Sequence, residues 1–181
     1  LVYCSEKTRL INLLYSIYGD DILNDDTIPG LHSICFRKAD FFVNNKVIVI
    51  PEIDLVAFRD TQSNKVFVYR YGRGDFQEVS PRRKIFYDAL FIGFRDLLKP
   101  EAVVEDEHGY RYAFSSTEVA VDGGRVVLVA IRYYASGVKS WIIKDIFAVT
   151  CNEDTEGQCT IYSFKNKQVI RNIAHEAKKQ M

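Results

Sequence analysis

The stretch Pro51-Glu52-Ile53-Asp54-Leu55-Val56-Ala57-Phe58, followed after a short polar turn by Lys65-Val66-Phe67-Val68-Tyr69-Arg70-Tyr71-Gly72-Arg73, decides the expected fold. Its two apolar runs predict neighbouring β-strands joined by a turn at residues 60–64. Glu52 and Asp54 stand two positions apart, so strand alternation would place both carboxylates on one face. Burying a carboxylate beside Ile, Leu and Val is costly unless it is paired or binds a metal, so the stretch predicts a site.

Helical spacing of apolar residues predicts three helices around these strands. The first follows a capping Ser5 and ends at Gly19, the second begins at Ser80-Pro81 and stops at Pro100, and the third covers residues 165–180. Further strands are expected at residues 46–50, 110–114, 125–134, 140–150 and 159–164. This order predicts an α/β fold, a mixed sheet flanked by helices, in a single domain over residues 1–181.

Charge is balanced but segregated along the chain. Lys and Arg number 24, as do Asp and Glu, so the overall basicity often found in nucleic-acid binders is absent. One basic cluster comprises Arg70, Arg73, Arg82, Arg83 and Lys84, and one acidic stretch comprises Glu101, Glu105, Asp106 and Glu107. The sequence holds no apolar run long enough for a membrane span and opens with no apolar leader, so we expect an intracellular protein without a membrane partner.

The cysteines, at positions 4, 35, 151 and 159, form no CxxC pair, which argues against a zinc cluster. Cys151 and Cys159 flank a polar loop between two apolar runs. They are either two small buried residues or a disulfide across a hairpin. A disulfide in an intracellular protein would indicate an archaeal or hyperthermophilic source, a virus of such a host included.

The quoted stretch resembles the PD-(D/E)XK nuclease superfamily, and in particular its archaeal Holliday-junction-resolvase-like branch. Glu52-Ile53-Asp54-Leu55-Val56-Ala57 matches the acid-bearing strand of that family, and Val66-Phe67-Val68 matches the start of the next strand. Ser80-Pro81-Arg82-Arg83-Lys84 is similar to the basic helix that follows. The resemblance covers about residues 5–100 and implies a restriction-endonuclease-like fold, completed by residues 110–181.

The resemblance also implies a site and its partners. Asp54 would be the central ligand of Mg²⁺ or Mn²⁺, with Glu6 and Glu52 as further metal ligands. Asp54, Glu52 and Lys84 would be catalytic, because the metal activates a water that the lysine orients towards the phosphate. The basic cluster, Arg70, Arg73, Arg82, Arg83 and Lys84, would bind DNA phosphates. Members of this branch commonly act as homodimers, so we expect a homodimer.

The sequence departs from the family pattern on the second quoted strand. Residues 69–72 are Tyr-Arg-Tyr-Gly, where the family has an acid and a lysine. Asp75 or Glu78 would have to replace the acid, and Lys84 the lysine. Three interpretations therefore stay open: a metal-dependent nuclease acting on DNA, including branched or junction DNA; a catalytically inactive nuclease-fold protein that binds DNA or serves a structural role; and a protein–protein adaptor, which the zero net charge permits.

Overall fold

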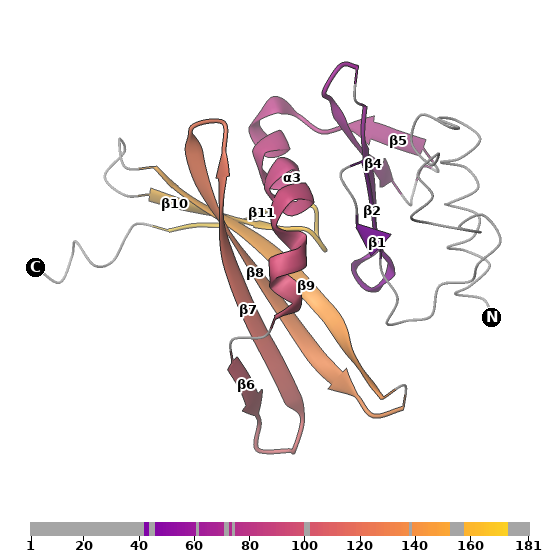
Figure 1. Cartoon of the computed structure of the whole chain (residues 1–181), viewed down its shortest axis with the longest axis vertical. Coiled ribbons are helices and arrows are strands. Elements are labelled where there is room, and N and C mark those ends of the chain that lie inside the picture. Colours follow the sequence, from indigo (N-terminus) through magenta and orange to yellow (C-terminus); the bar gives the residue numbers. More distant parts are fainter. Residues whose placement is uncertain are drawn as a thin grey trace, which may run out of the picture. The chain divides into compact units, whose positions relative to one another are not determined.

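The computed structural model describes residues 42–43, 46–60, 62–70, 73, 75–99, 102–137, 139–152 and 158–173 (Figure 1). The chain divides into two compact units, residues 1–84 and residues 85–181. Within the described residues each unit is built on one antiparallel sheet. The predicted helix-flanked mixed sheet is wrong, because the described residues are mostly antiparallel β-structure in two sheets. Short turns between consecutive strands explain this arrangement, since such turns join only antiparallel neighbours.

The five-stranded sheet of the first unit follows the order of the chain. Its elements are β1 (Phe42–Val43), β2 (Val47–Ile50), the 3₁₀ turn η2 (Pro51–Ile53), β3 (Leu55–Arg59), β4 (Val66–Arg70) and β5 (Asp75–Glu78). Every residue of β2, a Val-Ile-Val-Ile run, is buried, so both faces of this strand are covered. The predicted turn at residues 60–64 is confirmed: the Asp60 carboxylate accepts hydrogen bonds from the Gln62 N–H and the Ser63 hydroxyl.

The six-stranded sheet of the second unit is a meander in the order β11-β10-β9-β8-β7-β6. The elements are α3 (Pro81–Gly93), η3 (Phe94–Leu98), β6 (Ala102–Glu105), β7 (Arg111–Val121), β8 (Gly124–Ala135), β9 (Ser140–Asn152), β10 (Gln158–Ser163) and β11 (Gln168–Ile173). Asp122 and Gly123 link β7 to β8 with φ angles of 48° and 79°. Two consecutive positive φ values match the right-handed twist of a two-residue hairpin.

Helix α3 packs on one face of this sheet, which we call the inner face. Its Phe86 ring stacks on Tyr162 of β10 with centroids 4.8 Å apart. The Tyr87 hydroxyl lies 2.7 Å from the Tyr162 hydroxyl in a buried hydrogen bond. Gly93 lies so close to β7 and β8 that an added Cβ would be 2.5 Å from Val119 Cγ2. The helix start predicted from Ser80-Pro81 is thus confirmed, and the sheet explains the apolar face of the helix.

The C-terminal prediction is wrong where the structure describes it. Residues 168–173 form β11, paired antiparallel with β10, instead of part of a helix over 165–180. A tight return causes this: Lys167 has a φ of 56° and donates its N–H to the Ser163 carbonyl. The apolar positions 169, 170 and 173 fit one side of a helix, whereas 169 and 173 also fit one face of a regular strand, and pairing with β10 selects the strand. The predicted helix over residues 5–19 lies outside the described residues.

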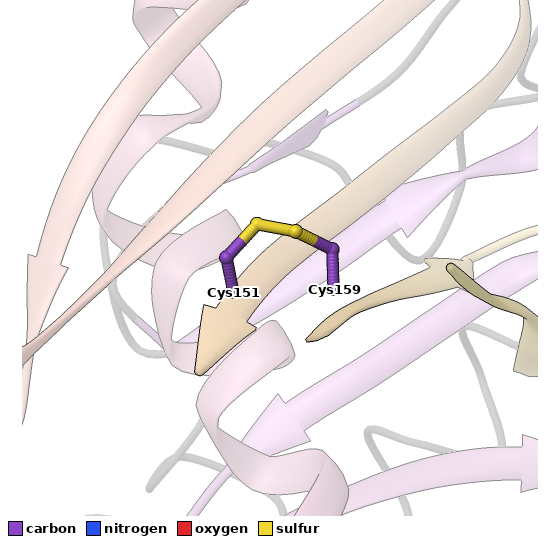
Figure 2. The surroundings of a disulfide bond; sticks show 2 residues. All are labelled: Cys151 and Cys159. Atoms are coloured by element: carbon purple, nitrogen blue, oxygen red, sulfur yellow. A yellow bond between two sulfur atoms is a disulfide. The ribbon is translucent and has the colours of Figure 1, made fainter. Parts of the chain in front are cut away.

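A disulfide joins Cys151 of β9 to Cys159 of β10 (Figure 2). The two residues are register partners on neighbouring strands, with Cα atoms 4.0 Å apart. Of the two alternatives for this pair, the structure has the disulfide. The disulfide links β9 and β10 next to the last residue of β9, Asn152, and the first residue of β10, Gln158.

Candidate functional site

The two acids of the quoted stretch do not lie on a strand. Glu52 is in η2, and Asp54 caps that turn in the left-handed region, with φ 50° and ψ 41°. The Asp54 N–H donates to the Pro51 carbonyl at 3.0 Å. Pro51 has no N–H and a φ suited to a helical first position, so the chain turns before β3 begins. The predicted strand alternation of Glu52 and Asp54 is therefore wrong, and Asp54 is exposed.

Strand β4 carries the positions where the resemblance required an acid and a lysine. Tyr69 is buried, with its ring edge-on to Phe76 at 5.3 Å between centroids. Arg70 donates two hydrogen bonds to the Asp75 carboxylate, at 2.9 Å and 2.6 Å. These bonds lower the pKa of Asp75 and raise that of Arg70. Asp75, expected as a replacement ligand, thus holds a bidentate ion pair between β4 and β5.

The other proposed replacement acid is paired as well. Glu78 lies 3.2 Å from the Lys65 ammonium group. Among the described residues, no three His, Cys, Asp or Glu side chains lie close enough together to hold a metal ion. Glu6 lies outside those residues. The predicted magnesium site, which includes Glu6, therefore stays a prediction, and the described residues alone do not complete it.

The members of the basic cluster differ in their exposure. Arg70 is engaged with Asp75, while Arg73 is exposed in the turn before β5. Arg82 and Arg83 are exposed in the first turn of α3, which contains no acidic residue. Lys84, the predicted catalytic lysine, is half-buried. Cations in a first helical turn oppose the helix dipole, so these two arginines are not explained by helix stability.

The face of the six-stranded sheet opposite α3 carries a patch that the sequence analysis did not identify. We call it the outer apolar face, and its residues come from four neighbouring strands: Phe114, Val127, Val129, Ile131, Phe147, Val149 and Ile161. Cross-strand register makes the patch continuous, through the pairs 114–131, 129–147, 127–149 and 149–161. Phe114 and Val127 are each 37% exposed, and the other members are half-buried.

Several charged groups near this patch have partners within the chain, whereas the exposed Arg171 is the register partner of Ile161. Glu118 and Arg125, on the same face at the β7–β8 end, form an ion pair at 3.1 Å. The buried Asp145 carboxylate accepts hydrogen bonds from the Ile146 N–H, the Ser163 hydroxyl and the Lys165 N–H. The centre of the outer apolar face is therefore apolar, with the exposed cations Arg171 and Lys144 at its margin.

Cation–aromatic contacts line the other end of the same sheet. The Arg111 guanidinium lies 4.2 Å from the Tyr134 ring centroid, and Trp141 packs edge-on to Tyr134 at 5.5 Å. On the outer side, the Lys144 ammonium lies 5.6 Å from the Tyr112 ring centroid. Each contact joins neighbouring or next-neighbouring strands, so the cluster stabilises the strand register.

Comparison with known proteins identifies no relative: no family model, curated protein or solved structure matches the chain. Among the described residues, no helix is both long and apolar enough to cross a membrane. The interpretation of function therefore depends on the geometry of the described residues alone.

Proposed function

We propose that the protein is a non-catalytic assembly module that self-associates through the outer apolar face. The observation that supports this proposal is the continuous apolar patch on the side of the sheet opposite α3. An antiparallel sheet with one face in water normally alternates apolar and polar residues. Here β8 presents Val127, Val129 and Ile131 on the face that α3 does not cover. Contiguous exposed apolar patches of this kind mark interaction surfaces.

A second copy of the chain is the partner that this patch fits. In a twofold contact the same residues meet on both sides, so unpaired like charges would oppose association. The two charged groups at the β7–β8 end neutralise each other, and Asp145 is buried and hydrogen-bonded. Two such sheets can pack face to face about 10 Å apart, with interdigitated side chains. Two copies would then cover each other's outer apolar face.

Sedimentation velocity over a wide concentration range tests this proposal. We expect a concentration-dependent dimer in the wild type and association at least about tenfold weaker in Val129→Lys, because the new charge would have to be buried in the contact. Ile92→Lys is the matched control, since Ile92 is 60% exposed on α3, away from the outer apolar face. Near-ultraviolet circular dichroism would verify that both variants fold. A wild type that stays monomeric at millimolar concentration, or a Val129→Lys variant that dimerises like it, would overturn the proposal.

DNA binding is a second candidate function, favoured by Arg82 and Arg83 in the first turn of α3. Their exposed guanidinium groups suit phosphate oxygens, and binding through them would weaken steeply as salt rises. We expect Arg82→Gln/Arg83→Gln to lose most affinity for supercoiled and branched DNA, measured without metal. Adding Mg²⁺ or Mn²⁺ tests the nuclease interpretation in the same assay. Cleavage that disappears in Asp54→Ala would support it, and the absence of binding at low salt would exclude both DNA-directed functions.

A further inference from the structure

Strand β6 ends the six-stranded sheet and is exposed along its whole length. It pairs with β7, and no other described strand lies beside it. Val103 is 58% exposed and Val104 is 49% exposed, on opposite faces of the strand. Natural edge strands are usually shielded by prolines, bulges, covering segments or inward charges, because an open edge can template another strand. Residues 102–105 are Ala-Val-Val-Glu, and the two central valines have high strand propensity.

The hairpin geometry shows which backbone groups of β6 face away from the sheet. The Asp106 N–H donates to the Tyr110 carbonyl at 2.8 Å, so the N–H of residue 106 points towards β7. Backbone direction alternates along a strand, so residues 102 and 104 also point towards β7. The N–H and C=O groups of Val103 and Glu105 therefore point to the open edge. They are the groups that an added strand would meet.

Charge argues against pairing of β6 with β6 of another copy. Glu105 and Glu107 are exposed beside the edge, and Glu101 precedes the strand in the sequence. Pairing with a second β6 would bring Glu105 and Glu107 of both copies to one contact. Like charges directly opposite each other destabilise a strand pair. The edge thus favours a strand with basic residues.

The other end of the same sheet supplies such a strand. β11 is the last described strand on that side and pairs with β10. Ile170 and Arg171 on it are exposed, and the exposed Lys165 and half-buried Lys167 come just before it. Among the described residues, the two ends of the sheet therefore combine edges with no further paired strand, exposed aliphatic side chains and opposite charge.

We propose that β6 of one copy accepts β11 of a second copy as its next strand, so that the six-stranded sheets join edge to edge. This inference rests on the proposed assembly function but uses a different surface. A contact between two different edges is heterologous, so it repeats from copy to copy and gives a ring or a linear chain. Face-to-face dimers would be linked into larger species by this contact.

Sedimentation velocity at low salt tests the inference, because species larger than a dimer report the edge contact. We expect Val103→Pro to remove these species and leave the dimer, since proline deletes only an N–H that points away from β7. Val103→Thr is the matched control, because it keeps the N–H and the strand propensity. The edge contact should also weaken as salt rises.

A charge exchange tests the identity of the two edges. Glu105→Lys and Arg171→Glu should each weaken assembly beyond the dimer at least about tenfold. A mixture of the two single variants should restore this assembly, because the new lysine on β6 of one variant would lie beside the new glutamate on β11 of the other. A synthetic peptide of residues 165–173 should compete with assembly, whereas a scrambled peptide should not. The proposed edge contact would be overturned if the Val103→Pro variant still formed species larger than the dimer. It would also be overturned if the wild type formed no species larger than the dimer. Neither result would affect the face contact, which Val129→Lys tests separately.

Discussion

Replacing Gly93 with alanine tests the packing of α3 on the six-stranded sheet. The new Cβ would lie 2.5 Å from Val119 Cγ2, 3.1 Å from Leu128 Cδ1 and 3.3 Å from Thr117 Cγ2. Overpacking of this kind costs about 1–3 kcal/mol. Alanine in place of glycine returns up to about 1 kcal/mol of helix propensity, and less at Gly93 because it is the last residue of α3. We expect Gly93→Ala to lower the free energy of unfolding by about 1–2 kcal/mol, after these two effects are combined.

Urea unfolding followed by the fluorescence of Trp141 measures this change, because Trp141 is the single tryptophan and lies on β9. Gly137→Ala is the matched control: an added Cβ there meets no atom within 4 Å, so stability should stay the same or rise slightly. Val119→Ala removes the atom that the new Cβ would meet, so the double variant should lose less stability than the two single losses added together. If Gly93→Ala proves as stable as the wild type, the close approach of α3 to β7 is wrong.

Three further predictions follow from single contacts. Replacing Cys151 and Cys159 with alanine should lower the free energy of unfolding of the second unit by about 2.5 kcal/mol, the chain-entropy value for a short loop, here with a sequence separation of 8; no change in the urea midpoint under oxidising conditions would contradict it. Asp145→Ala should destabilise the same unit by about 1–3 kcal/mol, because it leaves the buried Ser163 hydroxyl without its acceptor. Its thermal midpoint should fall below that of an exposed-site control, Glu118→Ala, and equal midpoints would count against the network. The Arg70 hydrogen bonds hold the pKa of Asp75 below its ordinary value, so their contribution to stability is present above the unfolded-state pKa and lost as pH falls through the lowered folded-state pKa. A carboxyl NMR titration should show this lowered midpoint moving up in Arg70→Gln, and an unchanged midpoint would disprove the pairing.

Several elements were predictable because their signals are local. Ser80-Pro81 combines a capping hydroxyl with a proline suited to the first helical position, and α3 begins at Pro81. Asp122-Gly123 supplies the two positive φ values that a tight hairpin needs. The strand-like composition of residues 125–134 and 140–150 matches β8 and β9. Such signals act within a few residues, so they do not require knowledge of the rest of the fold.

The fold class was not predictable from the same kind of signal. Val169, Ile170 and Ile173 suit one side of a helix as well as a strand, and the choice depends on β10, which is adjacent only in space. The predicted strand geometry of Glu52 and Asp54 was wrong for a related reason. Spacing of two positions describes a strand at 52 and 54, but Pro51 starts a turn, and aspartate tolerates the left-handed conformation that ends it. Asp54 therefore ends the turn that leads into β3.

The outer apolar face shows what the composition of these strands requires. Val126 to Ile131 of β8 is an unbroken apolar run, so both faces of that strand are apolar. Strands of this kind belong to sheets that are covered on both sides. Helix α3 covers the inner face through Phe86, Tyr87 and Gly93, which accounts for one half of the pattern. The residues on the other half, with Phe114 and Val127 still 37% exposed, are not covered by α3, and a second copy of the sheet would bury them.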